Sequence, residues 1–360
     1  MSQKAIIAKS PAHYQRFGIT NEIQPFEDGL RTDPSISGTY EWWYFDAHLD
    51  NGAKIVTTFF TKSAENPKGG LAPKIQIDID LPDGSKHSRL VAFDPSLFSA
   101  SKDQCDVQIG DNSFVGDLHT YRIQATVEDL AVDIELTGQT EPWRPETGHI
   151  LYGDDERGEF GWLPSVPYGT VNVTYRVGDQ STTTTTGHGY HDHNWGNVAL
   201  PTVVNNWYWG RGAVGEYTFI TAYIVSEKKY DYAAIPIFML AKDGKVIADN
   251  GKNVTFEKSG ITIDEITGKP VADVHSYAYD NENLRATLTY TRHETILRTK
   301  FADEMSGFMK LVLKLIGFDG SYLRFTGDVT INVTEHDAQP DQRKNTAIWE
   351  LMYFGKNRKE

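Results

Sequence analysis

A two-residue alternation of apolar and polar side chains recurs along most of this chain. Between Ile75 and Leu81, isoleucines and a leucine alternate with Gln and Asp, and Pro82-Asp83-Gly84 then forms a turn signal. Successive residues of a β-strand point to opposite faces of a sheet, so this period indicates strands with one apolar face. The same pattern predicts further strands at 121–127, 130–136, 171–177, 217–225, 233–241, 261–264, 283–292, 322–335 and 347–354.

Turn and helix signals complete the prediction of fold class. Runs 121–127 and 130–136 are separated only by Glu128-Asp129, which is the length of a tight hairpin turn. Segment 303–316 has the three- to four-residue apolar spacing of a helix, with acidic residues at its start and Gly317 after its end. Many short strands with one late α-helix predict an all-β fold of antiparallel barrels or sandwiches.

The length of the chain predicts two domains, because domains usually contain about 100–200 residues. The best boundary lies near 200–206, where Pro201 follows the densest motif and a new aromatic strand begins. We therefore expect an N-terminal β domain at 1–203 and a C-terminal β domain at 204–360, the latter with the helix at 303–316.

Composition narrows the classes of partner and the cellular location. The chain has 35 Lys and Arg residues against 49 Asp and Glu residues, and its formal charge of −14 disfavours nucleic acid and anionic membrane surfaces. No apolar run approaches the roughly 18 residues of a membrane span, and the apolar patch at 5–8 is too short for a secretory signal. Cys105 is the only cysteine, which excludes an internal disulfide and a zinc site built from cysteines. We expect a cytoplasmic protein, and the sequence does not set its oligomeric state.

The first unusual cluster is the aromatic segment 40–46. On a strand, Trp43 and Phe45 share one face, whereas Trp42, Tyr44 and Asp46 share the other. Two aromatic faces need apolar surroundings on both sides, so this strand is predicted to be central in its sheet. One interpretation is a thick aromatic core. The other is the wall of a ligand cavity that includes an acidic residue of the segment, because a buried carboxylate is costly unless it is paired.

The second cluster, at 187–196, contains three histidines in ten residues. If this segment is extended, His191 and His193 point to one side and Tyr190 and Asp192 to the other. A His-x-His spacing is common among metal ligands, and imidazole suits zinc, iron or copper. His188 or a distant carboxylate could supply a third ligand, but His-x-His alone is a weak signal, and neither a cysteine nor a second histidine pair supports the metal. We therefore expect a site without a metal or other cofactor.

The strand that follows, 205–211, adds aromatic area through Trp207 and Trp209. Arg211 either neutralises a carboxylate such as Asp192 or forms a structural ion pair. The chain contains no Gly-rich phosphate loop, Gly-x-Ser-x-Gly elbow or paired-cysteine motif.

Two motifs together carry a family resemblance, Glu41-Trp42-Trp43-Tyr44-Phe45-Asp46 and His191-Asp192-His193-Asn194-Trp195-Gly196. They resemble the carotenoid 1,2-hydratase (hydroxyneurosporene synthase)-like superfamily, which includes AttH-like proteins and fungal decalin-forming Diels–Alderases. The resemblance spans nearly the whole chain in order and spacing. It implies two lipocalin-like (calycin-type) antiparallel β domains and a hydrophobic ligand pocket associated with their interface. It also implies cofactor-free chemistry on polyenes, terpenoids or polyketide-derived substrates.

Within this resemblance, His193 and Trp195 match positions implicated in the proton-transfer site of the hydratases. Those enzymes place a Tyr-x-Asp on a following strand, and the comparable strand here, 218–225, contains Tyr223 but no Asp. We therefore expect a cofactor-independent cyclase or isomerase, such as a Diels–Alderase-type pericyclase, that acts on a hydrophobic small molecule. The alternatives are a hydratase or dehydratase of an isoprenoid alkene and a non-catalytic lipocalin-like carrier.

The candidate site residues follow from these motifs. Hydroxyl, imidazole and carboxyl groups would activate a carbonyl or act as a weak acid, and the aromatic rings would form the walls of the pocket. The predicted catalytic residues are His193, Trp195, Tyr190, Asp192, Glu41 and Asp46. The predicted substrate-binding residues are Trp42, Trp43, Tyr44, His191, Trp207, Trp209, Arg211 and Tyr223.

Overall fold

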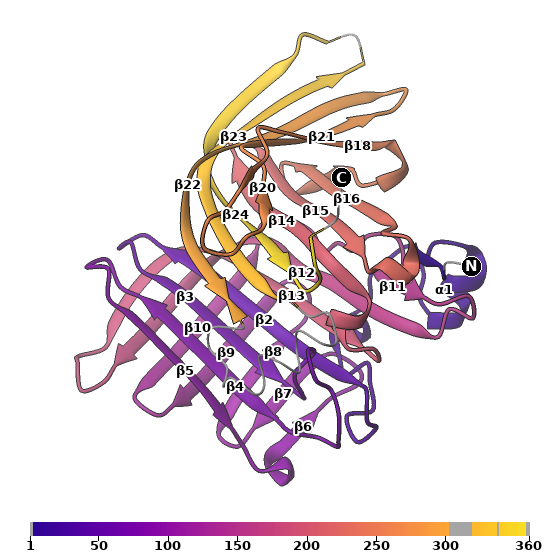
Figure 1. Cartoon of the computed structure of the whole chain (residues 1–360). Coiled ribbons are helices and arrows are strands. Elements are labelled where there is room, and N and C mark those ends of the chain that lie inside the picture. Colours follow the sequence, from indigo (N-terminus) through magenta and orange to yellow (C-terminus); the bar gives the residue numbers. More distant parts are fainter. Residues whose placement is uncertain (1–2, 302–318, 337, 358–360) are drawn as a thin grey trace. The chain divides into compact units, whose positions relative to one another are not determined.

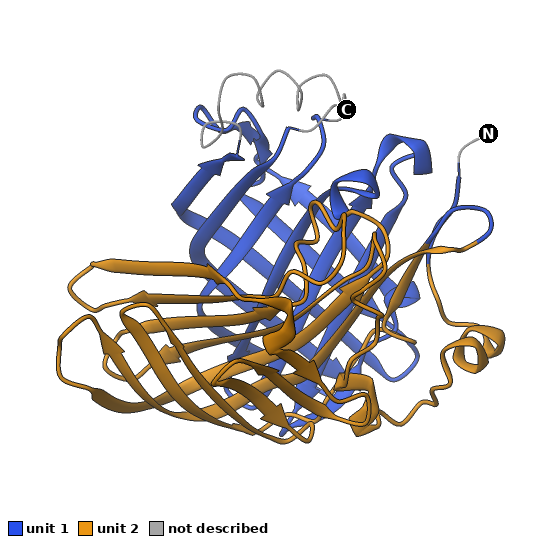
Figure 2. Cartoon of the chain, turned by 90° about the horizontal axis from the view of Figure 1, so that it is seen from below, with its two compact units in different colours: residues 1–6, 152–155, 200–360 blue, residues 7–151, 156–199 orange. Residues whose placement is uncertain are grey.

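The computed structural model describes residues 3–301, 319–336 and 338–357, and these residues form mainly β-strands (Figure 1). The chain divides into two compact units (Figure 2). Unit 1 comprises Met1–Ile6, Tyr152–Asp155 and Leu200–Glu360, and unit 2 comprises Ile7–Leu151 and Glu156–Ala199. Each unit is built on a large antiparallel sheet that curls into a half-barrel. The predicted all-β, lipocalin-like fold class is confirmed.

The larger sheet has 13 strands. They are β1 (Ala5–Ile7), β2 (Tyr40–Leu49), β3 (Lys54–Phe60), β4 (Lys74–Asp80), β5 (Lys86–Ala92), β6 (Phe98–Ala100), β7 (Cys105–Ile109), β8 (Asn112–Gly116), β9 (Thr120–Val127), β10 (Leu130–Gly138), β11 (His149–Tyr152), β12 (Gly158–Val177) and β13 (Thr183–Gly196). Their main order is β5-β4-β3-β2-β13-β12-β10-β9-β8-β7-β6, while β11 pairs with β12 and β1 pairs with β11. The aromatic strand β2 and the histidine-rich strand β13 are therefore neighbours near the centre of the sheet, as expected for β2.

The second sheet has nine strands, in the order β17-β16-β15-β14-β24-β23-β22-β21-β18. Their bounds are β14 (Val204–Val214), β15 (Tyr217–Ser226), β16 (Ala234–Lys242), β17 (Lys245–Ala248), β18 (Val254–Ser259), β21 (Val274–Asp280), β22 (Leu284–Lys300), β23 (Ser321–Glu335) and β24 (Asp341–Tyr353). The short strands β19 (Thr262–Ile263) and β20 (Pro270–Val271) pair separately.

Helical segments in the described residues are short. The 3-10 helices are η1 (Pro25–Asp28), η2 (Pro95–Leu97), η3 (Leu200–Thr202), η4 (Lys228–Tyr230) and η5 (Gly251–Asn253). The α-helix α1 (Pro11–Phe17) begins after Ser10, whose side chain accepts a hydrogen bond from the His13 amide, and ends at Gly18 with a φ of 66°. Apolar spacing did not predict α1, because none of its residues is buried. The predicted helix at 303–316 lies outside the described residues, and no described helix is long and apolar enough to cross a membrane.

The alternating pattern located six strands closely and others only in part, because β22 continues to Lys300 beyond the predicted 283–292 and β24 begins at Asp341, before the predicted 347–354. β4, β9, β10, β15, β16 and β23 differ from the predicted ranges by at most two residues at either end, and the predicted hairpin pairs Leu130 with Val127. By contrast, β12 is far longer than the predicted 171–177. Its first half contains two prolines, and its register with β13 shifts twice between Leu163 and Gly169. Bulges accommodate proline within a sheet and interrupt the alternation, which explains the missed half.

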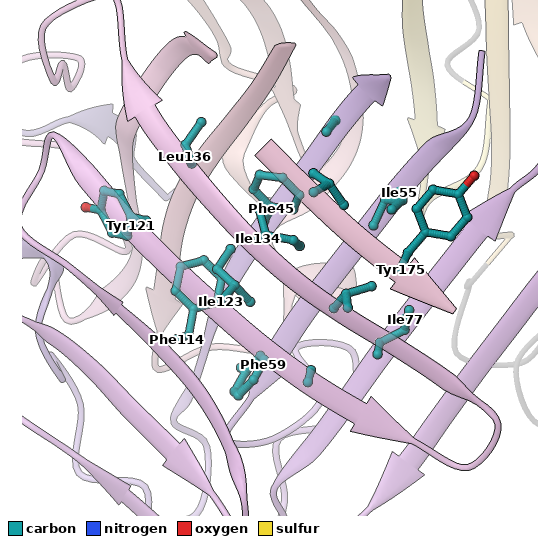
Figure 3. Close-up of a cluster of buried hydrophobic side chains, with 14 of the residues drawn as sticks. Phe45, Ile55, Phe59, Ile77, Phe114, Tyr121, Ile123, Ile134, Leu136 and Tyr175 are labelled. Carbon is teal, nitrogen blue, oxygen red and sulfur yellow. The ribbon is translucent and has the colours of Figure 1, made fainter. Parts of the chain in front are cut away.

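The apolar face of the larger sheet encloses the core of unit 2 (Figure 3). Burial of these aliphatic and aromatic side chains is the main force that holds the curled sheet together. The labelled members are Phe45, Ile55, Phe59, Ile77, Phe114, Tyr121, Ile123, Ile134, Leu136 and Tyr175.

The core of unit 1 contains a buried histidine, His275 on β21. Its ring stacks on Tyr290 with a centroid distance of 4.6 Å and lies 4.8 Å from the ring of Tyr208. Burial among these rings lowers the pKa of His275 to about 3, and the positive charge of Lys258 acts in the same direction. The imidazole is therefore neutral near neutral pH.

We expect acidification to destabilise the protein through His275. Because its folded-state pKa lies below the unfolded value of 6.5, the stability it contributes is complete above pH 6.5 and is lost as pH falls toward 3, by up to about 5 kcal/mol. His275→Phe cannot titrate, so its free energy of unfolding should fall less than that of wild type between about pH 7 and about pH 4. Urea unfolding at both pH values measures this difference. His119→Gln, at an exposed histidine, is the control, and an unchanged pH dependence in His275→Phe would contradict the assignment.

Candidate functional site

The antiparallel pairing of β2 with β13 sets which residues share a face. His193 lies opposite Trp43, His191 opposite Phe45, and Asp192 opposite Tyr44. Directly opposed residues point to the same side of a sheet. One side, here called the inner face, belongs to the unit 2 core because it carries Trp43 and Phe45. The other side, called the outer face, carries Asp192 and Tyr44, so the predicted division of the two motifs between faces is what the structure has.

On the inner face, Glu41 is completely buried but fully hydrogen-bonded. Its Oε1 accepts from the Arg31 amide at 2.7 Å and lies 2.8 Å from His193 Nε2. Its Oε2 accepts from the amide and hydroxyl of Thr32 at 2.9 and 2.8 Å. The His193 ring stacks on Trp43 at 4.6 Å. These donors compensate the burial of a carboxylate, which alone would be strongly unfavourable.

Asp28 joins the inner face from η1 and approaches both histidines. Its Oδ2 accepts a hydrogen bond from the Tyr121 hydroxyl and lies 3.2 Å from His191 Nε2. Its Oδ1 lies 3.4 Å from His193 Nδ1. Burial by itself would raise the pKa of Asp28, but the adjacent His191 and His193 outweigh it, and the pKa lies below the ordinary value.

Cys105, the single cysteine, belongs to the same buried group. Its sulfur and one ligand atom each of Asp28 and His191 all lie within 4.8 Å of one another. Burial raises the pKa of the Cys105 thiol well above its usual range, and the negative charge of Asp28 adds to the effect. In the absence of a cation, this cysteine is therefore a neutral thiol.

On the outer face, Asp192 is nine-tenths buried and has three donors. Its Oδ2 accepts from Trp162 Nε1 and from the Tyr190 hydroxyl, both at 2.8 Å, and its Oδ1 accepts from Asn194 Nδ2 at 2.8 Å. Burial raises the pKa of Asp192 to about 6 despite these hydrogen bonds. A carboxyl group that titrates near neutral pH suits proton transfer or hydrogen-bond donation to a substrate.

Aromatic side chains surround Asp192 on the outer face. Trp42 is half-buried and stacks between Tyr40 and Phe160, with centroid distances of 5.8 and 6.3 Å. The hydroxyl of half-buried Tyr44 donates to Asp46 Oδ2 at 2.9 Å. Apolar area with a few polar groups is the usual composition of a small-molecule site.

Trp195 continues the inner face beyond His193. Its indole nitrogen donates to Glu159 Oε1 at 3.2 Å, and the same oxygen lies 3.5 Å from His149 Nε2. Burial lowers the pKa of His149 to about 3 and raises the pKa of Glu159. The ring of Trp195 also lies over Gly161, the residue opposite it on β12.

Four predicted substrate-binding residues belong to unit 1, whereas the two motifs belong to unit 2. Trp207, Trp209 and Arg211 alternate along one side of β14 and are half-buried. Tyr223 on β15 stacks on Phe256 at 4.0 Å, at the edge of the unit 1 core.

A cavity of about 660 Å³ lies elsewhere in unit 2 and contains none of the predicted site residues. It is lined by Val132, Tyr175 and neighbouring residues at the β9–β10 hairpin. Tyr175 pairs with Thr183, eight residues along β13 from His191, which is roughly 26 Å of strand. We therefore assign the candidate chemistry to β13 and not to this cavity.

Sequence reasoning missed the residues that reach β13 from a distance. Asp28, Cys105, Tyr121, Trp162 and Glu159 were not singled out as site residues. Burial of two consecutive acids in η1 is not visible in the local pattern, because it depends on contacts with segments far along the chain. The one available signal was the pair Glu27-Asp28 between the apolar residues Phe26 and Leu30.

The sequence of this chain is similar to those of known proteins. A family model described as Diels-Alderase-like matches residues 30–265. The quinolone epoxide rearrangement protein asqO of Emericella nidulans is 23% identical over 304 residues, which cover 78% of this chain and 80% of that protein.

Two solved structures share the fold. A protein assigned as AttH from Nitrosomonas europaea has a TM-score of 0.60 and 16% identity, covering 97% of this chain and 100% of its own. CghA, solved with Sch210972, has a TM-score of 0.56 and 13% identity, covering 88% of this chain and 89% of its own.

We predict that Gly161→Ala displaces Trp195 and destabilises the protein. A Cβ at this position would lie 2.0 Å from Trp195 Cε2, and such overpacking typically costs about 1–3 kcal/mol. Gly70→Ala is the matched control, because its nearest neighbour would be 3.9 Å away, and we expect a change within about 0.5 kcal/mol. Chemical denaturation measures the free energy of unfolding of both variants. Equal stabilities would refute the close contact between the Trp195 indole ring and Gly161.

Proposed function

Because the chain belongs to the Diels-Alderase-like family, we propose that it is a cyclase or isomerase that rearranges a hydrophobic substrate on the outer face of β2 and β13. The substrate class is a polyene, terpenoid or polyketide-derived natural product. The family predicted from the two motifs is confirmed, and so is the prediction of an enzyme. The observation that carries the proposed site is the buried carboxyl group of Asp192 with its raised pKa.

Asp192 has the properties of a weak acid that activates an oxygen atom of the substrate. A pKa of about 6 leaves part of the population protonated near neutral pH, where catalytic acids are most effective. Oδ2 already accepts two hydrogen bonds, whereas Oδ1 accepts one. We therefore place the proton on Oδ1, from which it is donated to a carbonyl or epoxide oxygen. In a rearrangement the same proton returns to Asp192, so the substrate and the product have equal mass.

The rings around Asp192 supply the second requirement, a surface that holds a flexible substrate in a reactive conformation. Trp42 and Tyr44 are half-buried, so part of each ring is accessible beside the acid. Positioning reacting atoms close together can lower a barrier by about 7–11 kcal/mol. Because most of this face is apolar and its ionisable groups are acidic, it suits a polyene better than an anionic metabolite. His193 is wholly buried on the inner face, which makes it less accessible to such a substrate than Asp192.

We expect Asp192→Asn to lower turnover by about 10²–10⁴-fold, because the amide keeps the shape of the carboxyl group but donates no proton. Wild-type turnover should fall as pH rises through about 6, since the folded-state pKa of Asp192 marks the loss of its proton. The variant should lose that dependence. Glu135→Gln, at an exposed carboxylate on β10, is the matched control and should behave as wild type.

The assay uses a panel of linear polyenes with a terminal carbonyl together with a quinolone epoxide, with products followed by chromatography and mass spectrometry. A changed retention time at constant mass supports the proposal. Gain or loss of one water indicates a hydratase or dehydratase, and unchanged ligand that remains bound indicates a carrier. Either of these results overturns the proposed reaction, and equal turnover by Asp192→Asn and wild type overturns the proposed site.

A further inference from the structure

The acceptors beside His191 and His193 on the inner face show which ring nitrogen of each histidine carries a proton. His191 Nδ1 lies 2.8 Å from the Tyr44 carbonyl oxygen, which can only accept, so this nitrogen carries a proton. His193 Nε2 lies 2.8 Å from the Glu41 carboxylate and carries a proton for the same reason. The remaining nitrogens, His191 Nε2 and His193 Nδ1, are directed to Asp28.

Both nitrogens face the same carboxylate. The distances are 3.2 Å from His191 Nε2 to Asp28 Oδ2 and 3.4 Å from His193 Nδ1 to Asp28 Oδ1. Asp28 Oδ1 and His193 Nδ1 have no hydrogen-bond partner within the part of the chain that the structure describes. Buried polar atoms without a partner are costly, and an ion bound in this group would compensate that cost.

Cys105 makes this group a mixed donor set. Ligand atoms of Asp28, Cys105 and His191 lie within 4.8 Å of one another, and all three residues are buried. They come from η1, β7 and β13, so the fold itself brings them together. Carboxylate, thiolate and imidazole are the three side-chain ligands of zinc, and bonds of about 2.0–2.1 Å in a tetrahedral site separate adjacent N and O ligands by roughly 3.3 Å. The measured Asp28–His191 distance of 3.2 Å matches that separation.

The surroundings of the donors follow the pattern of a metal site. A metal-bound histidine usually donates its second N–H to a backbone carbonyl or a carboxylate. His191 does so to the Tyr44 carbonyl, and the Tyr121 hydroxyl donates to the carboxylate of Asp28. One carboxylate and one thiolate would balance the charge of a divalent ion, which lowers the cost of burying it.

We propose that Asp28, Cys105 and His191 bind a divalent transition-metal ion of the zinc class on the inner face of unit 2. On binding, the Cys105 S–H bond breaks, a metal–sulfur bond forms, and the proton leaves to solvent. Three protein ligands leave one position for water, and His193 Nδ1 is the nearby base that would accept a hydrogen bond from it. This inference rests on the inner face and is independent of the reaction proposed for the outer face.

The sequence predicted a site without a metal, because nothing near the His-x-His motif identified further ligands. The structure supplies two candidate ligands, Asp28 and Cys105, from distant segments of the chain. The role proposed for His193 differs from that of His191, because the Nε2–H of His193 is directed to Glu41.

The test is metal content and cobalt spectroscopy of the full chain. Because all three ligands are buried, the ion must enter during folding, so the protein is expressed in medium supplemented with Zn²⁺ or Co²⁺ and then dialysed. We expect about one metal ion per chain and, for the cobalt protein, a near-ultraviolet sulfur-to-cobalt charge-transfer band. Cys105→Ser should remove the band and lower the bound metal at least tenfold. His275→Gln, at a buried histidine of unit 1, should retain both.

Two results would overturn the proposal. One is wild-type protein from either medium that carries no bound metal, with nitrogen NMR showing protons on both ring nitrogens of His191 and His193. Protons would then occupy the place assigned to the ion. The other is cobalt protein that lacks the charge-transfer band, or that keeps its metal in Cys105→Ser, because the ion would then lie elsewhere. Both readouts on wild type remain decisive even if a variant fails to fold.

Discussion

The register of β2 against β13 determines where every ionisable group of the candidate site lies. Side chains alternate between faces, so a slip of β13 by one residue against β2 would exchange the two faces of β13. It would put Asp192 into the apolar core and move His191 and His193 out of it. The present register is favoured because Trp43 and Phe45 are buried with the core of unit 2. The burial of these aromatic residues thereby determines on which face the ionisable residues lie.

Each face of the sheet buries a carboxyl group, and the two groups have different hydrogen-bond partners. Glu41 accepts hydrogen bonds from two backbone amides and a hydroxyl and lies against His193. Asp192 accepts from three neutral side chains, and its burial still raises its pKa to about 6. Neutral donors offset only part of the cost of desolvating the Asp192 carboxylate. Asp192 is therefore the group that we propose for proton exchange on the outer face, and the cation is proposed for the inner face.

Local periodicity accounts for what could be predicted of this protein. The two-residue pattern located the major strands and separated His191 and His193 from Tyr190 and Asp192, since both depend only on the geometry of an extended chain. It could not reveal Asp28 or Cys105, because their contacts with β13 join segments 163 residues apart in the case of Asp28 and His191. The first half of β12 was missed for another reason, namely that its prolines and bulges interrupt the alternation.

Because both faces are carried by the same strand, His191 and His193 are chain neighbours of Asp192. A rotation of the β13 backbone that moved Asp192 toward a substrate would also turn His191 away from the Tyr44 carbonyl and from Asp28. An ion held by Asp28, Cys105 and His191 would resist that rotation, since three ligands from separate elements would have to move together. The inner face would then act on the chemistry of the outer face by holding β13 rigid, without contact with the substrate. Preorganisation of this kind is what a rearrangement demands, because its barrier falls chiefly through fixed geometry.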